Sequence, residues 1–173
     1  MEQFHIIPVH VITLIEDPAN PVLFLYCQGE NKIIPVMIGQ PEARILALSL
    51  DKTNFDRPMT HNLLMNTIEA LGGEISRVVI YDMVDDIFYS KICITSGNSE
   101  IQVDARPSDA LILAVQSVKP IFVTERVLQK AGQVSPMGPR ESEHPHPTEK
   151  EIEDLKNHLH EAQEREQKGS QNS

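Results

Sequence analysis

Apolar and polar residues alternate in several short stretches of the chain. The first covers residues 4–14 and is rich in Ile and Val; two short, mainly apolar runs follow at residues 22–26 and 32–38, after turns with proline, asparagine or glycine. Alternating runs between such turns are typical of β-strands. We therefore predict a three-stranded antiparallel meander. Pro35 marks an edge position or a strand start, because proline cannot donate a hydrogen bond to a neighbouring strand.

The apolar spacing then becomes helical and alternates with further strands. A helix is predicted to open at Pro41, and a second one to be capped by Thr60 and ended by Gly72 and Gly73. Further strands are predicted at residues 75–81, 88–94, 101–103 and 120–123, and further helices from Pro107 or Ser108 to 118 and at 125–131. This order predicts an α+β fold: a mixed, largely antiparallel sheet with three to four helices packed on it.

The chain of 173 residues is long enough for one ordinary domain and a tail. We predict a domain over residues 4–132 and a proline-rich linker over 133–147. Residues 148–173 form a charged amphipathic tail helix, partly disordered, with a thin apolar stripe that includes Leu155. This helix either pairs weakly with a partner or remains solvated.

Composition narrows the functional classes. A net charge of −10 counts against a protein that coats nucleic acid through Lys and Arg, but it allows a small local phosphate site. No apolar run approaches the roughly 18 residues that span a bilayer, and the first residues lack a secretion signal, so we expect a cytoplasmic protein without membrane association. Cys27 and Cys93 lie in apolar runs without metal-type spacing and are expected as buried, reduced thiols.

The first candidate motif lies at the start of the second predicted helix. Arg57 offers a planar fork to a phosphate, His61 can exchange a proton near neutral pH, and Thr60 adds a hydroxyl between them. The free N–H groups of a helix start also attract anions. The competing interpretation is structural, with Asp56 and Arg57 forming a local ion pair and Thr60 acting only as a cap.

The second candidate motif is denser and lies where a strand meets the third predicted helix. Asp104 and Asp109 are candidate catalytic carboxylates and candidate ligands of Mg²⁺ or Mn²⁺, while Arg106 and Ser108 are candidate substrate-binding residues. Helix capping and an ion pair between Arg106 and Asp104 explain the same residues equally well. Glu42, near the start of the first helix, is a third candidate metal ligand, although a surface glutamate favoured by the helix dipole is the simpler interpretation.

Other polar residues are weaker candidates. The acidic group around Asp85 and Asp86 is typical of a hairpin turn. His144 and His146 lie in the predicted linker, and His158 and His160 are too close in sequence to share one helical face. Phosphate-binding loops, dinucleotide fingerprints, nucleophile elbows and zinc-type Cys/His spacings do not occur in the sequence.

Three motifs together resemble the bifunctional nuclease family over about residues 6–132: IIPVMIGQPEARILALSL, FDRPMTHNLL, and VDARPSDALILAV followed by KPIFV. The resemblance implies an α+β domain, usually oligomeric, whose plant members degrade both DNA and RNA. The positions that match the family motifs are Glu42, Arg57, Thr60, His61, Asp104, Arg106, Ser108 and Asp109.

One position departs from the family pattern. The family usually reads Thr-His-Asp, whereas this chain has Asn62 after His61. If the missing carboxylate is needed for hydrolysis, the chain binds nucleotides without cutting them; if it only orients the helix, asparagine serves nearly as well. We predict a nuclease acting on phosphodiesters. The alternatives are a non-catalytic module that binds nucleotides or oligonucleotides, and a purely structural role for the motifs in a homo-oligomer interface.

Overall fold

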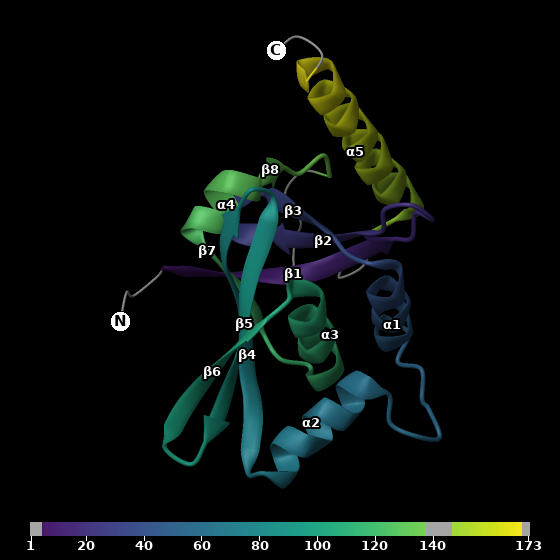
Figure 1. Ribbon diagram of the computed structural model, residues 1–173. Coiled ribbons are helices and arrows are strands. Elements are labelled where there is room, and N and C mark those ends of the chain that lie inside the picture. Colours follow the sequence, from purple (N-terminus) through teal and green to yellow (C-terminus); the bar gives the residue numbers. More distant parts are fainter. Residues whose placement is uncertain (1–4, 138–146, 171–173) are drawn as a thin grey trace.

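The strands form one eight-stranded sheet in the order β6-β5-β4-β7-β1-β2-β3-β8 (Figure 1). The structure is a computed structural model that describes residues 5–137 and 147–170. Its strands are β1 (Ile6–Ile15), β2 (Val22–Cys27), β3 (Lys32–Met37), β4 (Gly73–Val84), β5 (Ile87–Ser96), β6 (Ser99–Ala105), β7 (Ile121–Thr124) and β8 (Gln133–Val134). Its helices are α1 (Gln40–Leu50), α2 (Thr60–Ala70), α3 (Pro107–Ser117), α4 (Glu125–Ala131) and α5 (Glu149–Ser170), with a 3₁₀ turn at Gln28–Glu30.

Strand β1 belongs to both halves of the sheet. Its first residues, from Ile6 to Val9, pair with β7, and its later residues, from His10 to Ile15, pair with β2. Strands β4, β5 and β6 then run across the direction of β1 and β2, as Figure 1 shows. Among the strands within residues 5–137 and 147–170, β4 and β7 pair in parallel and the other pairs are antiparallel. The sheet is mixed and largely antiparallel, which confirms the predicted α+β class.

The local strand predictions are confirmed by the pairing. Strands β1, β2 and β3 form the antiparallel meander, and β8 covers β3 only at Lys32 and Ile33, so Pro35 has an open edge beside it. The hairpin between β4 and β5 turns on Asp85 and Asp86, both with positive φ (48° and 62°). This left-handed pair matches the right-handed twist of the strands, which explains the aspartates there.

Helix α3 is the centre of the main core. Five consecutive residues, Ala110 to Ala114, are buried, which is possible only for a helix covered on nearly all sides. It packs against α1 and α2 on one side and against β4 and β5 on the other. The start of α3 is therefore held firmly beside the starts of its two neighbours. Within residues 5–137 and 147–170, no helix has the length and apolar character needed to cross a lipid bilayer.

A second, smaller core lies on the opposite face of the meander. Leu155 of α5 is fully buried against a cluster that includes Phe24, Tyr26 and Ile33. Every residue of β2 is buried as a result, because its two faces belong to different cores. Strand β8 lies within the range predicted as linker; the remainder of that range, with His144 and His146, falls mostly outside the described residues.

Candidate functional site at three helix starts

The first turns of α1, α2 and α3 meet at one place. Glu42 is the third residue of α1, His61 the second residue of α2, and Asp109 the third residue of α3, which Arg106 precedes as N-cap. Pro41 and Pro107 suit the first turns of their helices, because proline lacks the N–H that a helix start leaves unpaired. Helix packing around α3 thus joins motifs that are far apart in the sequence.

Four side chains form a connected polar network. His61 Nε2 lies 3.1 Å from Asp109 Oδ1. Arg106 donates from Nε to Asp109 Oδ2 at 2.7 Å and from Nη2 to Asp109 Oδ1 at 3.1 Å. The same Nη2 lies 2.9 Å from Glu42 Oε1. Arg106 holds Asp109 in a bidentate arrangement of the kind that arginine favours, and it binds Glu42 through a single contact.

The network is accessible to solvent. The Arg106 side chain is 66% exposed, that of Asp109 29%, that of Glu42 18% and that of His61 14%. Arg106 is therefore directly accessible to a ligand, whereas His61 is only partly accessible. The side chains stabilise one another without closing the site.

The charges of the network reinforce each other. Burial raises the pKa of Asp109, but hydrogen bonds from Arg106 and His61 outweigh it and leave this pKa below its usual value. The pKa of Arg106 is raised by its hydrogen bond to Asp109, by the charge of that carboxylate and, to a smaller degree, by Glu42. Asp109 is thus an ionised hydrogen-bond acceptor at neutral pH.

The His61–Asp109 contact is suited to proton transfer. A carboxylate beside one imidazole nitrogen orients the ring and fixes which nitrogen carries the proton. In the described part of the chain, Nδ1 of His61 has no hydrogen-bond partner. His61 lines the second pocket described below.

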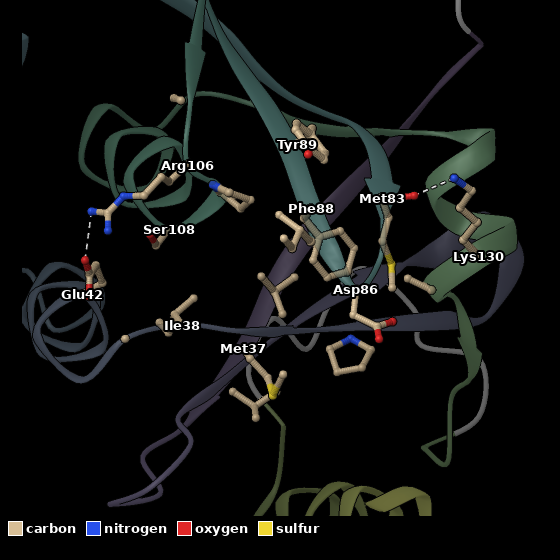
Figure 2. Close-up of a pocket in the computed structure, with 18 of the residues that line it drawn as sticks. Met37, Ile38, Glu42, Met83, Asp86, Phe88, Tyr89, Arg106, Ser108 and Lys130 are labelled. Carbon is tan, nitrogen blue, oxygen red and sulfur yellow. Dashed lines mark hydrogen bonds and ion pairs between the residues drawn. The ribbon is translucent and has the colours of Figure 1, made fainter. Parts of the chain in front are cut away.

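Two pockets flank Arg106. The first has a volume of about 810 Å³ and lies between β3, the β4–β5 hairpin, α4 and the start of α3. Figure 2 shows Met37, Ile38 and Phe88 around it, with Arg106 and Glu42 at one end and Lys130 at the other. The second has a volume of about 690 Å³, contains His61 and lies between α2 and the sheet. Arg106 and Glu42 line both pockets, and their ion pair is part of the wall between them.

Asp104 lies apart from the network, although it lines both pockets. Burial, followed by the charge of Asp104 and its side-chain hydrogen bond, raises the pKa of Tyr81 on β4. Among residues 5–137 and 147–170, no ion pair or hydrogen bond joins Asp104 to His61, Arg106 or Asp109. The structure therefore brings together Glu42, His61, Arg106 and Asp109, but leaves Asp104 with a different partner.

The remaining predicted residues lie around the site. Thr60 lines the second pocket and Ser108 the first. Thr60 is the first residue of α2 rather than its cap: Met59 occupies the cap position, and its N–H donates to Asn62 Oδ1 at 3.2 Å. The prediction of a Thr60 cap was wrong, because the helix begins one residue earlier than expected and Thr60 already lies in its first turn. Arg57 is exposed in the loop before α2, and in the part of the chain described here it forms no ion pair.

The carboxylates do not form a ready metal site as they lie. Glu42 and Asp109 both engage Arg106, and Asp104 interacts with Tyr81. Within the described ranges, no three His, Cys, Asp or Glu side chains are grouped to hold a metal ion. The expectation of Mg²⁺ or Mn²⁺ remains a prediction.

A second polar chain, which the sequence did not reveal, supports the site. Asn62 Nδ2 donates to Gln116 Oε1 at 3.2 Å, Gln116 Nε2 donates to Ser49 Oγ at 2.9 Å, and this hydroxyl donates to the Ile45 carbonyl at 2.7 Å. The chain links α2, α3 and α1 behind the site. Asn62 is therefore a structural residue, because its side chain points to Gln116 and the helix cap and is not part of the His61–Asp109 network. No local signal joins residues that are 54 positions apart.

Fold and site together define an α+β protein with an arginine, a histidine and two carboxylates at converging helix starts. The chain belongs to the bifunctional nuclease domain family, whose model matches residues 23–136. This match confirms the resemblance drawn from the three motifs.

Individual relatives show how far the likeness extends. An uncharacterised protein of Mycobacterium tuberculosis is 37% identical over 123 residues, which is 70% of this chain and 73% of that protein. Bifunctional nuclease 1 of rice (Oryza sativa subsp. japonica) is 28% identical over 118 residues, covering 66% of this chain but 36% of the rice protein. Bifunctional nuclease 1 of Arabidopsis thaliana is 22% identical over 117 residues, covering 65% of this chain and 36% of the plant protein. The chain thus matches about a third of the length of the plant nucleases.

Proposed function

We propose that the protein is a nuclease that hydrolyses phosphodiester bonds of RNA or DNA. The observation that carries this proposal is the contact of 3.1 Å between His61 Nε2 and Asp109 Oδ1, in a pocket that an exposed Arg106 also lines. Membership of the bifunctional nuclease domain family supports it, as do the names of the plant relatives.

In the proposed reaction, each side chain has one role. Arg106 binds the non-bridging oxygens of the phosphate and stabilises the negative charge that develops there. His61 removes a proton from the attacking water through Nδ1, while Asp109 stabilises the protonated ring. The water oxygen bonds to phosphorus as the bond to the leaving oxygen breaks, and the leaving oxygen takes its proton from solvent. Thr60 and Ser108 contribute further hydrogen bonds to the substrate, and Arg57 is a second cation that can approach from the loop. Glu42, Asp104 and Asp109 remain the proposed carboxylate ligands should a divalent ion bind.

A specific observation favours a second candidate, a non-catalytic module that binds nucleotides. Arg106 is already paired with two carboxylates, so the local charge is not strongly positive. An arginine that is already paired stabilises the charge of a transition state only weakly, so the same four residues would recognise a nucleotide through hydrogen bonds without cutting it.

The nuclease proposal predicts that His61→Ala lowers the cleavage rate by about 10²–10⁴-fold, the usual contribution of a positioned acid–base group. Asp109→Asn, which removes the charge beside the ring, lowers it by about tenfold or more. The rates are measured on single-stranded RNA and DNA, each with Mg²⁺, with Mn²⁺ and with EDTA.

His10→Ala and Asp51→Asn are matched controls, because both residues are exposed and lie outside the two pockets. Equal rates in His61→Ala and the wild type would contradict the catalytic role. Nucleotide binding that raises the melting temperature without any cleavage would support the binding module instead.

We further propose that the protein acts in the cytoplasm as a homo-oligomer. Helix α2 contributes no buried residue, and its Leu63, which lies outside both pockets, is exposed. An apolar helix face of this kind is commonly covered by another protein surface. Light scattering gives the mass that decides between an oligomer and a monomer.

A further inference from the structure

The two pockets on either side of Arg106 have features in common. Three large apolar side chains that are exposed to solvent line the first pocket: Met37, Ile87 and Tyr89. Three more line the second: Met59, Leu64 and Val103. Exposed apolar groups in a concave surface are typical of a ligand site, because they gain free energy when a ligand removes them from water.

The position of Arg106 relates the pockets to one another. Its guanidinium lines both, with an exposed fraction of 66%, so one anionic group bound there has an apolar pocket on each side. The volumes of about 810 Å³ and 690 Å³ each fall in the range of small-molecule sites. A cationic side chain between two largely apolar pockets matches a phosphodiester group that has a nucleoside on each side.

We propose that the site binds a dinucleotide unit of a single strand, with the phosphate on Arg106 and the flanking bases separated, one in each pocket. This inference rests on the proposed phosphodiester chemistry and adds how the substrate is recognised. Tyr89 offers an aromatic ring to the base in the first pocket, while Leu64 and Val103 offer aliphatic contacts to the base in the second.

The arrangement selects against a duplex. In a duplex the two bases on either side of a phosphate are stacked on one another, and separating them costs a few kcal/mol for each step. A single strand loses much less, because its bases are already free to unstack. The recognition contacts are made to base faces and to phosphate, so they accommodate RNA and DNA alike.

The test uses the His61→Ala protein, so that binding is measured apart from cleavage. Competition against a fluorescent single-stranded hexanucleotide gives affinities for four probes: the dinucleoside monophosphate TpT, thymidine monophosphate, and the two forms of TpT in which either the 5′ or the 3′ base is replaced by hydrogen. We expect removal of either base to weaken binding by about tenfold, because this change in affinity corresponds to the free energy of one base contact. The same hexanucleotide in a duplex is expected to bind at least tenfold more weakly.

Two pocket variants assign the bases. Met37→Trp fills the first pocket and Leu64→Trp the second, and both positions are exposed enough to accept a larger side chain without disturbing the core. Each variant is expected to bind TpT and one of the two singly abasic probes with equal affinity. It is still expected to bind the other abasic probe more weakly than TpT. Leu71→Trp is the matched control, because Leu71 is 80% exposed and lies outside both pockets.

The outcomes separate this inference from the proposed function. Equal affinity for TpT and the abasic probes, or for single strand and duplex, would overturn the two-pocket site even if the wild type cleaves. Base-dependent binding without cleavage by the wild type would support the site and contradict the nuclease. No binding of any probe would overturn the two-pocket site.

Discussion

At the residue scale, the site depends on how one guanidinium is shared. Arg106 pairs with Asp109 and Glu42 at once, and the three groups together carry one negative charge. Phosphate affinity is therefore limited by the two carboxylates, and any change that releases one of them makes the arginine more available. Glu42 is the partner to change, because Asp109 is also needed beside His61.

Gly39 gives an indirect way to move Glu42. A Cβ atom at this position would overlap Glu42 Oε2, and the carboxylate is the part that shifts, because it is the end of a flexible side chain. Gly39→Ala is therefore expected to release Arg106 and to tighten binding of a nucleotide about two- to fivefold, measured by fluorescence competition at constant salt. Its free energy of unfolding is expected to change by less than about 1 kcal/mol.

The control is Gly29→Ala, since nothing lies within 4 Å of a Cβ built at Gly29. Glu42→Gln gives the direct comparison, because it removes the charge without moving the backbone. Unchanged binding in Gly39→Ala together with tighter binding in Glu42→Gln would show that Glu42 does not shift as expected.

The sequence predicted most site residues but not their partners. The helix-start motifs contain Glu42, His61, Arg106 and Asp109, because capping preferences and charge are local properties. The turn of Asp104 toward Tyr81 depends on pairing between β4, β5 and β6. The contact of Asn62 with Gln116 depends on helix packing. Neither has a signal in neighbouring residues.

At the element scale, α5 acts as a cover for the outer face of the meander. Leu155 is fully buried there, although the sequence gives α5 only a narrow apolar stripe. A single well-placed side chain can stabilise such a helix, because a buried leucine contributes several times more than an exposed one. This helix therefore contributes to the stability of β2.

Leu155→Ala is expected to lower the free energy of unfolding by about 2–4 kcal/mol, since it leaves a cavity over Phe24 and Ile33. Chemical denaturation monitored by circular dichroism measures the change. Leu71→Ala is the matched control, because the same atoms are removed from a side chain that is 80% exposed, and it is expected to cost less than about 0.5 kcal/mol. Equal effects would show that α5 does not pack on the meander in solution.

The sequence predicted the positions of the helices and strands better than the pairing of distant strands. Strand and helix positions follow from apolar spacing. The meander, the strands β4 and β5 of the hairpin, and the helices α1 to α4 therefore lie close to the predicted ranges. The parallel pairing of β4 with β7 and the division of β1 between two neighbours were not predicted. Pairing between distant strands depends on the whole fold, because many strand orders satisfy the same alternation.

At the scale of the whole molecule, the net charge of −10 separates this protein from nucleic-acid-coating proteins. Under the proposed function, attraction of a strand depends on the few cations that line the pockets, chiefly Arg106 and Lys130. Few phosphate contacts release few counterions, so affinity depends only weakly on salt.

We expect the affinity of the His61→Ala protein for a single-stranded hexanucleotide to fall by less than about tenfold between roughly 50 and 200 mM salt, as for one or two phosphate contacts. Fluorescence anisotropy at several salt concentrations gives the slope. Arg106→Ala is expected to flatten the slope by about 0.7, and Arg44→Ala, which changes an exposed arginine outside the pockets, leaves it unaltered. A steep slope in the parent protein would point to an extended basic surface elsewhere.

The double pairing of β1 has a mechanical consequence. Because one continuous strand supplies hydrogen bonds to β7 at one end and to β2 at the other, neither half of the sheet can separate without pulling on the other. Melting is then a single cooperative event, in which calorimetric and van 't Hoff enthalpies agree. Any force or substitution that frays the middle of β1 spreads to both halves at once.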